Sequence, residues 1–210
     1  MSPSTTNLST TTLLVIDSQL AFTHASHWGP SRSNPAYESN ITSLLTHFRL
    51  LRRSLSPDSR PRIIHVRHAS RDPASPLHPE AEGFAWMPYS TPLEDEEVVT
   101  KSVNSSFIGT DLEERLRAQG VRRLYVAGLS TDHCVSTTVR MAGNLGVVDG
   151  VGESGEEESG EVVLVSDATA CWRKPKGVWD AETVMAVHVE SLREFAEVRG
   201  TEEVVRECAL

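Results

Sequence analysis

The thiol of Cys134 lies at a point in the chain where it could act as a nucleophile. The segment AGLSTDHCV (127–135) follows an apolar run typical of a strand and precedes a stretch with the apolar spacing of a helix. The first backbone N–H groups of a helix carry partial positive charge, which favours the thiolate that attacks carbonyl carbons. The alternative is an inert cysteine, buried as a small apolar residue.

Two charged residues, Asp17 and Lys101, follow other predicted strands and could assist this thiol. A cysteine nucleophile needs a base to take its proton and surroundings that favour the anion. Asp17 comes directly after the apolar run 13–16, and Lys101 ends the run 97–100. Each has a simpler explanation, because an aspartate can cap a turn and a strand-end lysine can be a solvated charge. Their matching positions favour the catalytic interpretation.

The elements that would position these residues alternate along the chain. We predict strands at 13–16, 62–66, 97–100, 122–127 and 162–166, and helices that start at Asn34-Pro35, at a capping box from Thr110 to Glu113, at Cys134 and at Asp180. This alternation indicates an α/β fold with a mainly parallel sheet and helices on both faces. Ligands bind beyond the carboxyl ends of such strands. We therefore expect five residues to gather at one edge: Asp17, His68, Lys101, Cys134 and Asp167.

The composition is that of a globular protein and argues against several functional classes. Of the 210 residues 39% are hydrophobic, and the formal net charge of −9 argues against a nucleic-acid-binding surface. No apolar run approaches the roughly 20 residues that span a bilayer, and the polar N-terminus does not resemble a secretory signal. Three cysteines without a CxxC pair are typical of a reducing cytosol. We expect a cytoplasmic protein without a nucleic-acid or membrane partner.

We interpret residues 1–210 as a single domain with two irregular segments. Residues 1–10 are expected to form a polar N-terminal tail. Residues 147–161 are rich in glycine and glutamate, which predicts a flexible, acidic, solvated insertion.

Taken together, these segments resemble the isochorismatase-like cysteine hydrolases, a family that includes nicotinamidases and N-carbamoylsarcosine amidase. The resemblance implies a three-layer Rossmann-like fold with a six-stranded sheet. The matching segments cover most of the chain in the family's order: LLVIDSQLAF (13–22), HVRHAS (65–70), VVTKSVNSSFIGTDLEERLRAQGVRRLYVAGLSTDHCVSTTVRMAGNLG (98–146), VSDATA (165–170) and WDAETVMAVHVESLREFAEV (179–198).

The resemblance also implies roles for individual residues. Asp17, Lys101 and Cys134 correspond to a catalytic triad, and the peptide bond between Leu129 and Ser130 corresponds to a cis bond. The backbone N–H groups of Ser130 and Cys134 would then form an oxyanion hole. Asp17 would take the thiol proton, Cys134 would attack a carbonyl carbon, and water would later cleave the thioester.

Departures from the family's patterns narrow the expected substrate. Isochorismatases proper cleave a vinyl ether and typically lack the cysteine, so Cys134 favours a C–N bond of a small amide or ureido compound. His65 and His68 lack the paired aspartate of metal-dependent nicotinamidases, so we expect no catalytic metal and no cofactor. The alternatives are an isochorismatase-type vinyl-ether hydrolase and a non-catalytic binding module on the same fold.

The substrate pocket is expected to draw on aromatic residues near the strand ends. Candidates for its wall are Phe22, His68, Trp86 and Phe107, although Phe22 and Trp86 could instead pack the long loop 70–95 onto the domain. His65 is interpreted as a core residue and His133 as a structural one that points away from the thiol. The partner is a small-molecule substrate, and the resemblance implies a homo-oligomer, either a dimer or a tetramer.

Overall fold

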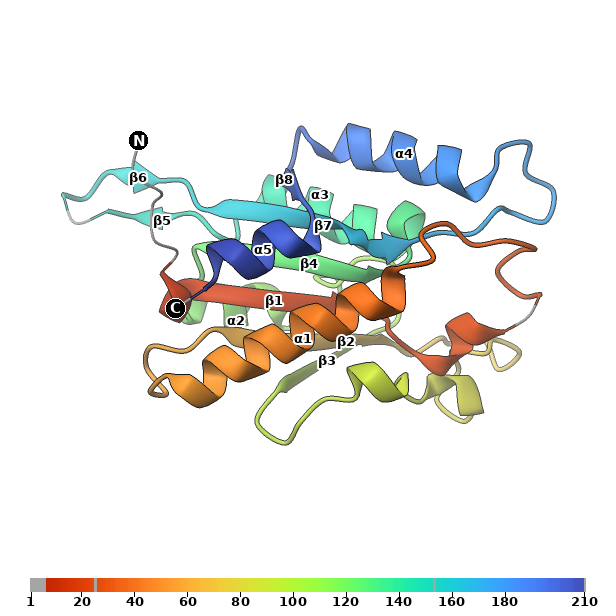
Figure 1. Cartoon of the computed structure of the whole chain (residues 1–210), viewed down its shortest axis with the longest axis horizontal. Helices are drawn as coiled ribbons and strands as arrows, with labels where there is room; N and C mark the ends of the chain where they lie inside the picture. Colours follow the sequence, from red (N-terminus) through yellow and green to blue (C-terminus); the bar gives the residue numbers. More distant parts are fainter. Residues whose placement is uncertain (1–6, 25, 153, 210) are drawn as a thin grey trace.

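A six-stranded parallel sheet forms the centre of the molecule in a computed structural model that describes residues 7–24, 26–152 and 154–209. Its strand order is β3-β2-β1-β4-β7-β8 (Figure 1). The strands are β1 (Thr11–Ile16), β2 (Arg62–His68), β3 (Glu97–Lys101), β4 (Arg123–Leu129), β7 (Glu161–Ala170) and β8 (Glu197–Arg199). The predicted α/β class and the six-stranded sheet are confirmed.

Side chains alternate along each buried strand, so both faces of the sheet carry apolar side chains. Helices cover both of these faces. Leu13 and Val15 of β1 pack towards one face, and Leu14 and Ile16 pack towards the other. The first face is covered by α1 (Tyr37–Ser54) and α5 (Thr201–Glu207), and the second by α2 (Leu112–Ala118), α3 (Ser136–Leu145) and α4 (Ala181–Leu192) (Figure 1). In the described part of the chain, no helix is long and apolar enough to cross a membrane.

Two predicted helices begin a few residues later than expected. The first begins at Tyr37 and not at Asn34, which has a positive φ of 49° and whose side-chain amide donates to the carbonyl oxygens of Asp167 and Thr169 in β7. The capping box of α2 does not form, since α2 begins at Leu112, and the Thr110 hydroxyl accepts from the Leu112 N–H at 3.4 Å and donates to the Ser106 carbonyl at 2.6 Å. Asp180 does cap α4, accepting from the Thr183 N–H at 2.7 Å.

The strand β7 is longer than predicted, and two further elements, β8 and α5, follow α4. The fifth strand of the sheet, β7, runs to Ala170, so Asp167 lies within it and not at its end. The Asp167 carboxylate accepts from the backbone N–H and the hydroxyl of Thr201 at the start of α5. Asp167 is therefore used in packing α5 and does not join the residues at the strand ends. Both β8 and α5 were missing from the prediction, because each is short.

The two irregular segments contain some regular structure in their described residues. Residues Leu8–Thr10 of the expected tail form a 3₁₀ turn capped by Asn7. Within the acidic insertion, β5 (Gly150–Val151) pairs in antiparallel fashion with β6 (Glu157–Glu158). Arg122 forms an ion pair with Glu158 at 3.0 Å, which ties this hairpin to the domain.

Candidate active site

Three strand ends at one edge of the sheet bring Asp17, Lys101 and Cys134 together. Asp17 follows β1, Lys101 ends β3, and Cys134 lies in a π-helical turn (Thr131–Val135) after β4. The Lys101 Nζ atom lies 2.7 Å from Asp17 Oδ2 and 3.3 Å from Cys134 Sγ. All three residues are buried, with 7% or less of their surface exposed. One buried ammonium thus contacts both a carboxylate and a thiol.

His68, at the end of β2, is the third partner of the Lys101 ammonium. Its Nδ1 atom lies 3.1 Å from Lys101 Nζ. An ammonium group can only donate, so Nδ1 accepts and the ring proton is on Nε2. Burial, together with the charge of Lys101, lowers the pKa of His68 below its ordinary value, although Asp17 opposes this shift. The imidazole is therefore neutral at neutral pH.

The thiol of Cys134 is protonated in the resting site, contrary to the expectation from the helix terminus. Burial and the nearby Asp17 carboxylate raise the pKa of Cys134 far above its ordinary value, and Lys101 only partly offsets them. Burial alone would lower the pKa of Lys101, but the charge of the Asp17 carboxylate raises it. Cys134 also lies within a π turn that precedes α3, so the terminal N–H groups of a regular α-helix do not surround it.

Asp17 is placed to receive the thiol proton. Its backbone has a positive φ of 50°, which turns the chain sharply at the end of β1. Its Oδ2 atom accepts from Lys101, whereas its buried Oδ1 atom has no hydrogen-bond partner among the described residues. Oδ1 can therefore take a proton while Oδ2 keeps its bond to Lys101.

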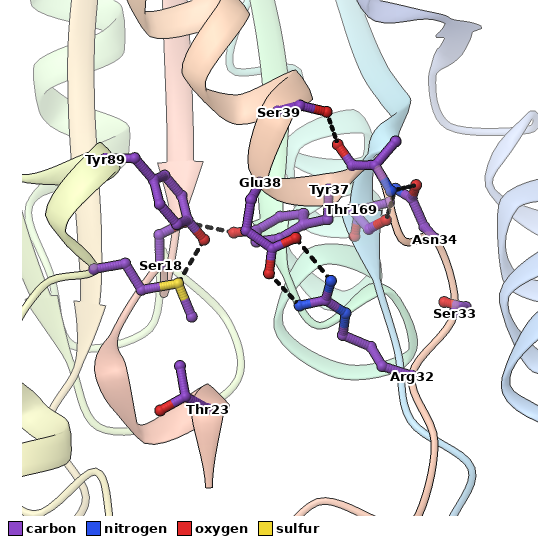
Figure 2. Close-up of polar contacts among 12 residues, drawn as sticks. Ser18, Thr23, Arg32, Ser33, Asn34, Tyr37, Glu38, Ser39, Tyr89 and Thr169 are labelled. Atoms are coloured by element: carbon purple, nitrogen blue, oxygen red, sulfur yellow. Dashed lines mark hydrogen bonds and ion pairs between the residues drawn. The ribbon is translucent and has the colours of Figure 1, made fainter. Parts of the chain in front are cut away.

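The residue after Asp17 is tied to the start of α1. The Ser18 and Tyr37 hydroxyl groups lie 2.6 Å apart, and Tyr37 is fully buried (Figure 2). Arg32 forms a two-fold ion pair with Glu38, the next residue of α1, and its guanidinium lies over the Tyr37 ring (Figure 2). These contacts fix the backbone that carries the Asp17 carboxylate.

The peptide bond between Leu129 and Ser130 is cis in the structure, as the resemblance implies. Ser130 begins the turn that carries Cys134, and its carbonyl oxygen accepts from the N–H groups of His133 and Val135. The Ser130 hydroxyl donates to Asp132 Oδ1 at 2.9 Å. The turn that would hold the oxyanion is therefore closed by hydrogen bonds of its own.

A cavity of about 400 Å³ opens onto Cys134. Two of the four residues proposed for its wall, Phe22 and His68, line it, whereas Trp86 and Phe107 are not among the lining residues. The lining consists of Phe22, His27, Trp28, His68, Ser75, Leu77, Asn104, Ser130, His133, Cys134, Lys174 and Pro175. A larger hollow of about 740 Å³ lies at the opposite ends of the strands, near Thr11 and Glu161, far from the thiol.

Trp86 and Phe107 have packing roles in the structure. Trp86 is half-buried, pairs through its backbone with Gln19, and places its ring edge against His65, with ring centroids 5.8 Å apart. Phe107 belongs to the apolar core beneath α2 and α3. The aromatic wall is instead extended by Trp28, whose ring stacks on Phe22 with centroids 4.4 Å apart.

Sequence reasoning also missed other lining residues, among them His133, Lys174 and Asn104. His133 lines the cavity although it was expected to point away, and Lys174 reaches the cavity from the segment before α4. The Asn104 Oδ1 atom lies 3.8 Å from Cys134 Sγ. Asn104 stands three residues after Lys101, in the segment that resembles the family, which is the one signal that could have indicated it.

A second cluster surrounds the buried Glu96 carboxylate, consists of Arg49, His65, Glu96 and the backbone N–H of Leu93, and is called the Glu96 cluster. The Glu96 carboxylate accepts two bonds from Arg49, at 2.7 and 2.8 Å, and one from the Leu93 N–H at 2.9 Å. His65 Nε2 lies 2.9 Å from Glu96 Oε2. His65 is fully buried, as expected of a core residue. Despite the burial of Glu96, these bonds hold its pKa well below the ordinary range.

The comparisons with known proteins agree with this geometry. The family model of the isochorismatase domain matches residues 11–203, which is nearly the whole chain. The chain belongs to the isochorismatase family. An isochorismatase family protein of uncharacterized function from Bacillus subtilis, YrdC, is 35% identical over 93% of this chain and 94% of its own length. The family resemblance inferred from the sequence is confirmed.

Two further isochorismatase-family relatives span the same region. A secreted isochorismatase effector from Verticillium dahliae, Isc1, is 32% identical over 95% of this chain and 90% of its own length. The crystal structure of an isochorismatase-family protein from Chromobacterium violaceum is 34% identical and superposes with a TM-score of 0.81, covering 99% of this chain and 98% of that one.

The donor atoms at the site are of types that can bind a metal ion. One ligand atom each from Asp17, His68 and Cys134 lies within 4.8 Å of the others, and such a set could coordinate zinc. Lys101 Nζ contacts all three residues, at 2.7, 3.1 and 3.3 Å. The ammonium therefore already supplies the positive charge at the centre of this group, and a metal ion there would have to approach it closely.

Proposed function

We propose that this isochorismatase-family chain is a cysteine hydrolase that cleaves a C–N bond of a small amide or ureido compound. The observation that carries the proposal is the contact of Lys101 Nζ with both Asp17 Oδ2 and Cys134 Sγ inside a buried site. A thiol beside a carboxylate and an ammonium, at the floor of a small cavity, is the arrangement that nucleophilic acyl transfer needs.

The first step follows from the protonation states. The Cys134 thiol gives its proton to the Asp17 carboxylate while Sγ forms a bond to the substrate's carbonyl carbon. The carbonyl π electrons move to oxygen, and the oxyanion is held by the backbone N–H groups of Ser130 and Cys134. The Lys101 ammonium balances the negative charge as it moves from Asp17 to the substrate.

The second step releases the amine or ammonia and restores the thiol. The oxyanion collapses, the C–N bond breaks, and the Asp17 proton passes to the leaving nitrogen, which leaves a Cys134 thioester. Asp17 then takes a proton from water while the water oxygen attacks the thioester carbon. Collapse of this second intermediate breaks the C–S bond, and the proton returns from Asp17 to the sulfur.

We further propose that the reaction requires no metal ion. The positive charge that a metal would supply is provided by Lys101, which contacts Asp17, His68 and Cys134. Dialysis against a strong chelator is expected to leave turnover unchanged. Loss of turnover that is restored by one divalent cation would contradict this part of the proposal.

The direct test is an amidase assay that measures ammonia release from a panel of small amides and ureido compounds. Cys134→Ala is expected to abolish turnover, whereas Cys208→Ala, which removes a buried thiol outside the site, should retain it. Mass spectrometry of the wild-type protein mixed with substrate should detect the acyl adduct on Cys134. Full turnover by Cys134→Ala would refute the mechanism, and turnover of isochorismate with none of the amides would favour vinyl-ether hydrolysis.

A further inference from the structure

The lining of the cavity differs in charge from the rest of the chain. The sequence contains 29 acidic and 20 basic residues other than histidine. The cavity lining contains no aspartate or glutamate among the described residues, but it includes Lys174 and three histidines. Although the protein is acidic, the described lining of the cavity that opens onto Cys134 therefore contains no carboxylate.

The donors at the mouth of this cavity are held by one buried carboxylate. Asp132 accepts from Ser130 Oγ at 2.9 Å, from His133 Nδ1 at 3.0 Å and from Lys174 Nζ at 2.7 Å. We call these four residues the mouth cluster. The Asp132 side chain is only 4% exposed and is not part of the lining, whereas its three partners all line the cavity. Asp132 is therefore a buried residue behind the cavity lining, and it orients three residues of that lining.

The two large partners keep capacity to bind a ligand. The side chains of His133 and Lys174 are 46% and 44% exposed, so each presents atoms to solvent in the cavity. An ammonium has three N–H donors, of which the contact with Asp132 uses one. The charge of Asp132 is shared among three donors, and these contacts hold the pKa of Asp132 well below its ordinary range.

The aromatic side of the cavity complements the mouth cluster. Phe22 stacks on both Trp28 and Trp172, with ring centroids 4.4 and 5.5 Å apart. Phe22 and Trp28 line the cavity together with Leu77. The cavity therefore offers an apolar wall for the body of a small molecule and the Lys174 ammonium at its mouth.

We propose that Lys174 binds a carboxylate of the substrate, so that the substrate is a small anionic amide or ureido acid and not a neutral amide. This inference rests on the proposed function, because it places the scissile carbonyl at Cys134. The two N–H donors of the Lys174 ammonium that Asp132 does not use can bind the oxygens of a carboxylate. The cavity of about 400 Å³ limits the substrate to a small molecule.

The test uses two alkylating reagents of similar size that differ in charge, iodoacetate and iodoacetamide. Their rates of reaction with Cys134 are measured by mass spectrometry of the Cys134 peptide, and the rate ratio is normalised to that of glutathione. In the wild-type protein the normalised ratio should favour iodoacetate by about tenfold, the effect of one charged hydrogen bond. Alkylation needs no turnover, so it reports on recognition alone.

Three variants localise the effect. Lys174→Met should lower the normalised ratio about tenfold, and Lys174→Arg should preserve it. The matched control is Lys176→Met, which removes the same charge two residues away from an exposed side chain outside the lining, and it should leave the ratio unchanged. Circular dichroism of all three variants checks that they fold.

The outcomes separate this inference from the proposed function. A wild-type ratio equal to that of glutathione, or an equal fall in Lys174→Met and Lys176→Met, would overturn carboxylate binding while leaving the nucleophile intact. Failure of both reagents to modify Cys134 would contradict the proposed function itself, and the inference would fall with it.

Discussion

Two buried carboxylates, Asp17 and Glu96, occupy similar surroundings and differ in how completely their oxygens are bonded. Both side chains are 0% exposed, and each lies beside a cation, Lys101 or Arg49, and near a histidine. Glu96 uses both oxygens, accepting from Arg49, His65 and the Leu93 N–H. Asp17 leaves Oδ1 without a partner among the described residues.

The difference shows how one type of buried ion pair can serve either structure or chemistry. A carboxylate whose two oxygens both accept hydrogen bonds gains little from accepting a proton, so the Glu96 cluster serves structure. A carboxylate with one free oxygen near a thiol can accept a proton without breaking its ion pair. The substitutions below therefore should affect turnover at Asp17 and stability at Glu96.

Asp17→Asn should have the largest effect. Asparagine keeps the shape of the side chain but removes the proton acceptor, so kcat/KM for any amide substrate should fall by about 10² to 10⁴-fold, the usual contribution of a general base. The measurement is ammonia release per folded molecule, with the folded fraction taken from circular dichroism. Retention of more than a tenth of the activity would show that Asp17 is not the base.

Glu96→Gln should affect stability and leave turnover nearly unchanged. Removing one partner of a buried pair leaves Arg49 without its counter-charge, so the free energy of unfolding at pH 7 should fall by about 3 kcal/mol. Urea denaturation measures this loss, and kcat per folded molecule should remain within about twofold. A large loss of kcat in the folded variant would contradict the distinction between the two clusters.

The same variant has an expected pH dependence. The pKa of Glu96 is lowered in the folded protein from 4.5, so its contribution to stability is present above pH 4.5 and is lost as the pH falls through the folded pKa. The stability difference between wild type and Glu96→Gln should therefore shrink as the pH is lowered below 4.5. A difference that stays constant would contradict the assigned bonding.

The pH dependence of turnover should be a smaller effect. We expect kcat/KM to fall by about tenfold per pH unit on the acid side of the profile only. Because the Cys134 pKa is raised and the thiol proton passes directly to Asp17, kcat/KM should be flat between about pH 7 and pH 9. It should decline only below the ordinary histidine pKa of 6.5, where His68 gains a proton beside Lys101. An increase in rate near pH 8.5 would indicate that a preformed thiolate is the reacting species.

Tyr37→Phe should have the smallest effect. It removes the bond to the Ser18 hydroxyl, and a net hydrogen bond contributes about 1 kcal/mol to stability. Because Ser18 follows Asp17, kcat/KM should also fall by about two- to fivefold. Tyr125→Phe is the matched control, since it removes a comparable hydrogen bond, from the buried Tyr125 hydroxyl to Glu207, away from the cavity, and it should leave kcat/KM unchanged.

The alternation of apolar runs and amphipathic stretches was sufficient to predict the sheet, because burial on both faces imposes that pattern on every long strand. Local capping signals were less reliable. Asn34 and Thr110 have the side chains of helix caps, but the helices begin at Tyr37 and Leu112, because Asn34 has a positive φ and its amide bonds to β7, and because Thr110 belongs to a turn closed by its bond to Ser106. The short elements β8 and α5 carry too few residues for a periodic pattern.

At the site, residues fixed by strand ends were predictable and residues supplied by loops were not. Asp17, His68, Lys101 and Cys134 come together because parallel strands end at one edge. Trp28 and Lys174 reach the cavity from irregular segments whose directions depend on tertiary packing. The protonation state of Cys134 was also out of reach, since the depth of burial that raises its pKa is a property of the whole fold.

The strand order gives Lys101 a further consequence. Lys101 belongs to β3, the edge strand, whereas Asp17 follows β1, which lies two strands further in. At the usual strand spacing the backbones of β3 and β1 are about 10 Å apart. An edge strand pairs on one side only and can detach by local opening while the central strands stay protected from hydrogen exchange. Such opening would withdraw the ammonium from the thiol without unfolding the domain. Turnover therefore depends on β3 being paired with β2. A mild concentration of denaturant should abolish turnover before it unfolds the rest of the sheet.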